Sequence, residues 1–116
     1  MPKEKKTLLD FWEEQMRQSH TASNYFFRKS PSHYHMMLIV MHAYKYDANL
    51  SVEELKTKLF KTSRPKSALM IKEACDKNFF LLEKKGKDNR KKYVIPTPDF
   101  INEFNEYLKT LNNLSF

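Results

Sequence analysis

The side chains with the clearest chemistry in this sequence are lysines and arginines gathered in one segment. Thirteen of the 21 Lys and Arg lie between Lys56 and Lys92, where only four acids stand, so this segment carries a net charge of +9. The remaining residues carry −2, which gives the whole chain its net charge of +7. Ammonium and guanidinium groups at this density bind phosphates, and they favour a polyanion as the partner.

Other kinds of chemistry lack the residue patterns that they require. The sequence has no Gly-rich phosphate loop, no nucleophile elbow and no HExxH motif. His33, His35 and His42 lie close together in the chain, but no second cysteine or well-placed carboxylate completes a metal site with them. We therefore expect a protein that is not an enzyme, with no catalytic residues, no metal and no cofactor.

Length and composition indicate one small domain over residues 1–116. Hydrophobic residues make up 41% of the chain, which suffices for one core, and a single Gly argues against an all-β fold with many tight turns. The longest apolar run, from Met36 to Met41, is too short to cross a bilayer, so no membrane partner is expected. A single cysteine, Cys75, cannot form an internal disulfide, which fits a cytoplasmic protein.

Apolar periodicity and capping signals divide the chain into helices around one hairpin. The second helix is apolar nearly all round and is expected at the centre of the core. A capping box formed by Ser51 and Glu54 starts the third, and Ser63 with Pro65 starts the fourth. The expected elements are helices over residues 7–28, 32–46, 51–60, 63–77 and 99–115, and strands over residues 79–83 and 90–95.

This order, α-α-α-α-β-β-α, predicts a mainly α fold with a small β-hairpin, arranged as a winged helix-turn-helix. Residues 51–95 would form the helix-turn-helix and the wing. An α-helix fits the major groove of a duplex, where each base pair presents a distinct pattern, and a basic hairpin beside it reaches the backbone or the minor groove. The charge and the element order therefore point to double-stranded DNA as the partner.

A series of short motifs extends from Ser63 to Phe104: a serine-started helix, a short turn, an apolar strand, a D-x-R tip and a threonine-started helix. In this chain they are Ser63, Asn78-Phe79-Phe80-Leu81, Asp88-Asn89-Arg90-Lys91-Lys92 and Val94-Ile95-Pro96-Thr97. The stretch resembles the DNA-binding lobe of the MarR (multiple antibiotic resistance regulator) family. The chain departs from the family at Ala68-Leu69, where members often carry polar or arginine residues, and it has only one helix after the wing.

The resemblance implies which residues meet DNA. Arg90 would enter or flank the minor groove with Asp88 orienting it, and the first turn of the fourth helix would lie at the major groove. Together with the charged hairpin tip, the expected DNA-binding residues are Ser63, Arg64, Lys66, Ser67, Lys84, Lys85, Lys87, Asp88, Arg90 and Lys91.

The resemblance also implies a homodimer. In the family the first and last helices pair two subunits, and here apolar stripes run from Leu8 to Phe26 and from Phe100 to Leu114. A two-fold dimer would set its two recognition helices roughly 34 Å apart, one turn of DNA. The stripes can instead close the core of a single chain.

Two smaller questions stay open from the sequence. The methionines of the second helix, Met36, Met37 and Met41, either fill the core or line a pocket for a small-molecule effector. Cys75 is expected as a small core residue, and the alternative is a redox-sensing thiol activated by neighbouring lysines.

The function that these observations favour is a homodimeric, sequence-preferring DNA-binding protein that regulates transcription. The alternative is a protein–protein adaptor without DNA binding, with exposed aromatics near Trp12, Tyr25 and Phe26 as its interface. A replication initiator or RNA binder is a third reading. The aromatics of the basic segment, Phe79, Phe80 and Tyr93, are expected on buried strand positions, which counts against a single-strand reader.

Overall fold

The computed structural model describes residues 5–17, 23–87 and 90–116, and all structural statements below refer to these. Their fold is mainly α with one antiparallel two-stranded hairpin, in the order of a winged helix-turn-helix. The elements are α1 (Leu8–Met16), α2 (Ser23–Phe27), α3 (Pro31–Lys45), α4 (Val52–Lys58), α5 (Arg64–Asp76), β1 (Phe80–Lys84), β2 (Lys92–Pro96) and α6 (Pro98–Asn112).

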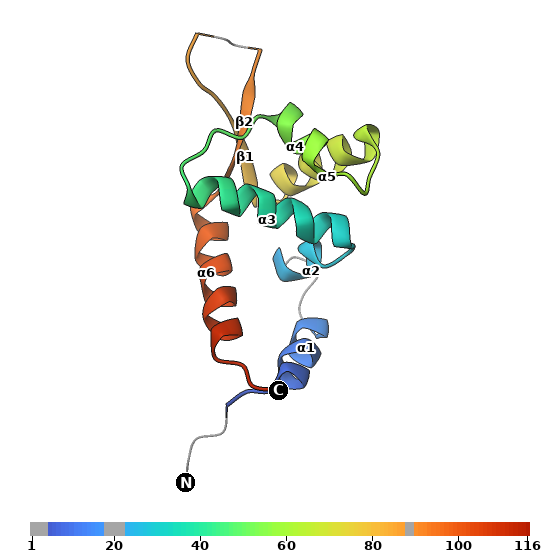
Figure 1. Ribbon diagram of the computed structural model, residues 1–116, viewed down its shortest axis with the longest axis vertical. Coiled ribbons are helices and arrows are strands. Elements are labelled where there is room, and N and C mark those ends of the chain that lie inside the picture. Colours follow the sequence, from blue (N-terminus) through green and yellow to red (C-terminus); the bar gives the residue numbers. More distant parts are fainter. Residues whose placement is uncertain (1–4, 18–22, 88–89) are drawn as a thin grey trace.

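The molecule is elongated, with a head and an arm. The described residues between 23 and 104 form the head, and α1 together with residues 105–116 forms the arm. The loop of the hairpin lies at one end and α1 with the end of α6 at the other (Figure 1). The molecule measures 60 × 26 × 23 Å and has a radius of gyration of 15.9 Å. A compact domain of this length has a radius of gyration of about 13 Å, so the arm extends beyond a closed globule.

Phenylalanines from three separate segments form the centre of the head. The ring centroids of Phe26 and Phe27 in α2 lie 4.9 Å apart, and Phe27 lies 5.1 Å from Phe100 of α6. Phe79 and Phe80, at the start of β1, each lie 5.9 Å from Phe100. All five side chains are buried. This cluster joins α2, the hairpin and α6 into one body.

The predicted capping signals start the helices where the sequence indicated. Ser51 and Glu54 form the full capping box of α4, and Ser63 accepts from the amide of Lys66 at the start of α5. Thr97 caps α6 in the same way, and its hydroxyl also donates to the carbonyl of Asn78 over 2.8 Å. These interactions are local, and the observed helix bounds lie within three residues of the predicted ones, except in the first helix.

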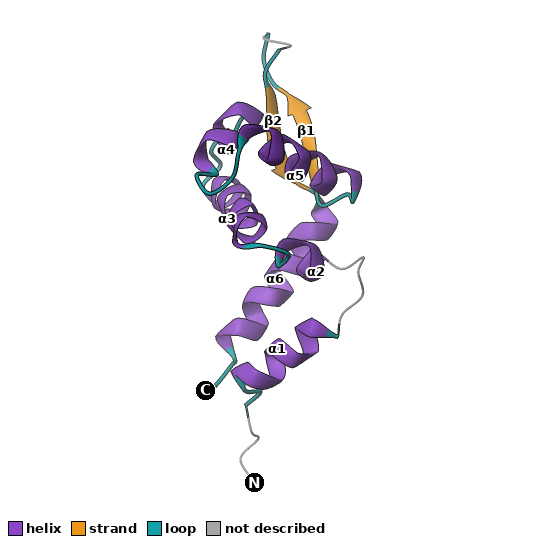
Figure 2. Cartoon of the chain, turned by 90° about the vertical axis from the view of Figure 1, so that its right-hand side faces the viewer, coloured by secondary structure: helices purple, strands orange, loops and turns teal. Residues whose placement is uncertain are grey.

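The chain turns from α5 into the hairpin at Asn78, whose φ of 64° lies in the left-handed region that Asn tolerates. From there β1 pairs with β2 in a register that sets Phe80 opposite Pro96 and Leu82 opposite Val94. Figure 2 shows the hairpin beside α4 and α5, with its loop projecting beyond both. The turn at Asn78 therefore fixes the direction in which the hairpin leaves α5.

The prediction of one first helix over residues 7–28 is wrong. Two helices stand there: α1 ends at Met16 and α2 begins at Ser23, while residues 18–22 lie outside the described part of the chain. The sequence around the break is rich in Ser, Thr and Asn, which compete with the helix for backbone hydrogen bonds. Apolar periodicity continues across such a break, so the periodicity alone did not reveal it.

Backbone and side-chain contacts close the arm. The amide of Leu8 donates to the carbonyl of Ser115 over 2.8 Å, and the amide of Ser115 donates to Lys6 over 3.0 Å. Phe11 of α1 is buried, and its ring centroid lies 5.7 Å from that of Tyr107 in α6. The two ends of the described chain are thereby held side by side (Figure 1).

His33, near the start of α3, gives the head a pH dependence. Its side chain is buried, and its Nδ1 lies 2.7 Å from the hydroxyl of Ser30. Burial lowers its pKa from the ordinary value of 6.5, and the nearby Lys29 and Lys66 lower it further against an opposing effect of Glu73. The unfolded chain therefore binds a proton that the folded head excludes.

We expect the free energy of unfolding to fall as the pH drops through the ordinary pKa of histidine, because the unfolded His33 gains its proton at a higher pH than the folded one. Chemical denaturation at a series of pH values measures this slope. The variant His33→Gln should flatten it, whereas His42→Gln, at an exposed position of the same helix, should leave it unchanged. Equal slopes in the wild type and in His33→Gln would contradict the assignment.

Candidate nucleic-acid interface

Helices α4 and α5 and the hairpin gather the basic residues at one end of the molecule (Figure 1). α5 buries one face against the head through Ser67, Met70, Ile71 and Ala74, and it packs against β1. Its opposite face is open to solvent. α5 and the hairpin thus present their charged surfaces together, as the sequence predicted.

Arg64, in the first turn of α5, is paired within the protein. Its Nη2 donates to a carboxylate oxygen of Glu53 in α4, and the ammonium of Lys56 lies 3.4 Å from the other oxygen of the same carboxylate. The side chains of Arg64 and Glu53 are 63% and 64% exposed. An exposed ion pair of this kind contributes at most about 1 kcal/mol, so a phosphate can take the place of Glu53. This pairing across two helices was not predicted from the sequence.

Ser67 must be withdrawn from the predicted DNA-binding residues. Its side chain is fully buried, and its hydroxyl donates to the carbonyl of Ser63 over 2.9 Å. It stands on the face of α5 that meets the core, one turn after the cap. Two nearby predicted residues, Ser63 and Lys66, are exposed, and the side-chain oxygen of Ser63 caps α5.

The hairpin carries most of the remaining predicted contacts. Lys84, Lys87 and Lys91 are exposed. Lys85 makes contacts within the protein. Its ammonium donates to Oδ1 of Asn49 over 3.0 Å and lies 5.8 Å from the centroid of the Tyr93 ring.

The D-x-R tip of the hairpin is described only in part. Arg90 is exposed. Asp88, predicted to orient it, lies outside the described residues. The relation between the two therefore stays a prediction.

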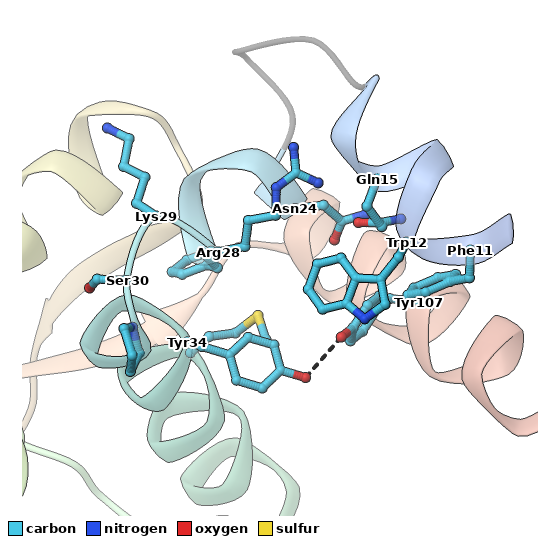
Figure 3. A pocket seen from close by; sticks show the side chains of 12 residues that line it. Phe11, Trp12, Gln15, Asn24, Arg28, Lys29, Ser30, Tyr34 and Tyr107 are labelled. Atoms are coloured by element: carbon cyan, nitrogen blue, oxygen red, sulfur yellow. Dashed lines mark hydrogen bonds between the residues drawn. The ribbon is translucent and has the colours of Figure 1, made fainter. Parts of the chain in front are cut away.

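A pocket lies between the arm and the head. Its volume is about 560 Å³, and both arm and head contribute to its walls: Phe11, Trp12, Gln15, Asn24, Phe27, Arg28, Lys29, Ser30, Pro31, Tyr34, Met37 and Tyr107. Figure 3 shows these side chains and the hydrogen bond of 2.8 Å that joins the hydroxyls of Tyr34 and Tyr107 across the junction. Burial and this hydrogen bond raise the pKa of Tyr107. At neutral pH Tyr107 therefore keeps its proton.

Arg28 is the most unusual side chain of the pocket. Its Nη1 is buried without a hydrogen-bond partner among the described residues, and its guanidinium carbon lies 5.7 Å from the centroid of the Tyr25 ring. A buried guanidinium nitrogen normally donates a hydrogen bond, so this atom is left able to bind an acceptor.

The structure bears on two open points from the sequence. Met36, Met37 and Met41 all lie in the core of the head, and Met37 also lines the pocket. Burial, and secondarily the charge of Asp76, raise the pKa of Cys75. A raised pKa disfavours the thiolate that a redox-sensing cysteine needs.

Within the described ranges, no three His, Cys, Asp or Glu side chains gather as a metal site. Nor does any helix of those ranges have the length and apolarity to cross a membrane. Among the described residues, the cations of α5 and the hairpin form one chemical feature, and the pocket at the arm forms another.

Comparison with known proteins adds little to these features. No family model matches the sequence, and no curated protein matches it. Among solved structures, the crystal structure of apo (heme-free) PefR is similar over 90% of this chain and 83% of that chain, with 20% sequence identity and a TM-score of 0.49. At that identity and score, the winged helix-turn-helix assignment rests on the order and packing of this chain's own elements.

Proposed function

We propose that this protein binds double-stranded DNA as a homodimer and regulates transcription. The observation that carries the proposal is the segment of net charge +9 folded into α4, α5 and the hairpin at one end of the molecule. α5 would enter the major groove, and the hairpin would follow the backbone or the adjacent minor groove. A regulator of transcription acts on chromosomal DNA, so the proposal includes a cytoplasmic location.

Phosphate neutralisation would supply most of the affinity. The contacts would come from seven of the exposed cations of α5 and the hairpin: Arg64, Lys66, Lys84, Lys85, Lys87, Arg90 and Lys91. Each phosphate that a cation neutralises releases a counterion, so binding should weaken steeply as salt is raised. Ser63 would approach the backbone from the start of α5, and Asp88 would act through Arg90.

We expect the triple variant Lys84→Ala, Lys87→Ala and Lys91→Ala to bind duplex DNA more weakly and with a shallower salt dependence. Loss of three phosphate contacts should reduce the slope of log K against log salt by roughly 2 to 3. Fluorescence anisotropy with a random-sequence duplex over a salt series measures both quantities.

The matched control removes three exposed lysines outside α5 and the hairpin, through Lys5→Ala, Lys45→Ala and Lys109→Ala. It changes the net charge equally and should keep the wild-type slope. Equal losses in both triple variants would reject the hairpin as the DNA contact, and no binding by the wild type at low salt would reject the function.

The arm supports the homodimer. On α1, apolar side chains stay exposed at a spacing of three and four: Leu9 is 68% exposed, Trp12 50% and Met16 70%. An exposed apolar stripe of this kind commonly marks an interface. Some residues of the two predicted stripes are not available for a dimer contact, because Phe26 and Phe100 lie in the core of the head. The exposed residues of α1, with Leu108 of α6, would form the contact.

We expect a mass in solution of twice the single chain, measured by sedimentation or light scattering. The double variant Leu9→Glu and Met16→Glu should be a monomer, because it sets two charges in the proposed contact. Leu38→Glu, at an exposed leucine of α3, is the control and should remain a dimer. A monomeric wild type would remove the homodimer from the proposal and leave DNA binding to be judged on its own.

The pocket supports a small-molecule effector as a second proposal. Its volume of about 560 Å³ lies within the usual range for ligand sites, and its walls are largely aromatic. The guanidinium of Arg28, which lines the pocket, would bind the anionic group of such a ligand. Because the pocket joins arm to head, an occupant would alter how α5 stands relative to the dimer contact.

We expect small organic carboxylates such as benzoate or naphthoate to raise the melting temperature by mass action. Arg28→Met should lose this effect, and Arg17→Met, at an exposed arginine outside the pocket, should retain it. Equal shifts in the wild type and Arg28→Met would show that Arg28 does not hold the ligand.

The burial of the aromatics in the predicted adaptor interface weakens the adaptor alternative. Phe26 is fully buried, and Tyr25 is partly buried, so of the three aromatics only Trp12 is widely exposed. Trp12 belongs to the stripe that the homodimer would cover. The adaptor would be favoured by a monomer that fails to bind DNA at low salt.

A further inference from the structure

The outward face of α5 is apolar at its centre. With 100° between successive residues, the stripe opposite the buried face consists of Pro65, Leu69, Lys72 and Asp76. Leu69, in the middle of this stripe, is 55% exposed, and Ala68 beside it is half-buried. A large aliphatic side chain therefore projects from the middle of the helix that would enter the groove.

The charged members of this stripe are engaged with each other. The ammonium of Lys72 donates to the carboxylate of Asp76 over 2.7 Å, one turn further along the helix. Arg64 stands at the edge of the helix and is paired with Glu53. The stripe contains no Arg, Asn or Gln, the side chains that form bidentate hydrogen bonds with guanine and adenine.

Resting on the DNA binding proposed above, we propose that Leu69 determines specificity by packing against the C5-methyl group of thymine in the major groove. Thymine is the base that presents an apolar group there, and aliphatic side chains contact it. Pro65 and Ala68 border Leu69 and would extend the apolar contact to a neighbouring methyl group. The preferred duplex would then carry thymines under the middle of α5.

The surroundings of Leu69 favour a nucleic acid over a protein as the occupant. Lys66 and Lys72 flank it on α5. The hairpin, which contains further lysines, lies beside α5 (Figure 2). Protein interfaces are depleted of lysine, because its ammonium loses water and flexibility on burial. In a groove, the same ammonium groups meet phosphates while Leu69 faces the bases.

The experiment first enriches bound duplexes from a random-sequence pool with the wild-type protein. The enriched duplex is then synthesised twice, once with thymidine and once with deoxyuridine, which lacks only the C5-methyl group. Burial of one methyl group corresponds to about a fourfold change in affinity, so the wild type should bind the uracil duplex about fourfold less tightly. Leu69→Ala should bind both duplexes equally.

Two control variants make the ratio specific to this side chain. Leu69→Met keeps an aliphatic contact and should retain most of the discrimination. Leu38→Ala truncates an equally exposed leucine of α3 and should discriminate as the wild type does. Both positions are exposed, so neither truncation should cost much stability, which circular dichroism would check.

The outcomes separate this inference from the proposed function. Binding that is strong but has the same thymine-to-uracil ratio in the wild type and Leu69→Ala would overturn the inference while DNA binding stands. No binding to any duplex at low salt would overturn both. A third duplex, with 5-methylcytosine in place of cytosine, carries the same methyl group. If 5-methylcytosine changed the affinity while replacing thymine by uracil did not, the contacted methyl group would not belong to thymine. That result would overturn the inference.

Discussion

The relation between the recognition helix and the wing depends on one cluster of aromatic rings. Phe79 and Phe80 enter this cluster directly after the left-handed turn at Asn78, so the hairpin begins where its first residues are already buried. Phe27 of α2 and Phe100 of α6 pack around them. Because close-packed rings resist small displacements, α5 and β1 are held at a fixed angle. A partner that contacts both must match that angle.

Local signals in the sequence were sufficient for most of the fold. The caps at Ser51, Ser63 and Thr97 and the turn at Asn78 each depend on a few neighbouring residues, and the structure confirms all of them. The break after Met16 was missed, because the apolar pattern fits both one long helix and two short ones. Which part of that pattern enters the core is decided by packing against α6, and periodicity carries no record of that packing.

The candidate site divides in the same way. The concentration of cations is a property of composition and needed no structure. The burial of Ser67, by contrast, follows from the face of α5 that meets β1, and the pairing of Arg64 with Glu53 follows from how α4 crosses α5. The sequence offered Met37 as a possible pocket residue, but it did not reveal the other walls, which come from segments as distant as Trp12 and Tyr107. Contacts between distant segments decide these features, and no spacing in the sequence encodes them.

The pairing of Leu8 with Ser115 has a consequence for biosynthesis. Residues near the start of α1 leave the ribosome early, yet their backbone partner is made almost a whole chain later. The head contains its own aromatic cluster and can condense while translation continues. α1 must wait with its apolar side chains uncovered until α6 has emerged. The arm therefore closes last, after the whole segment from Leu8 to Ser115 has been made.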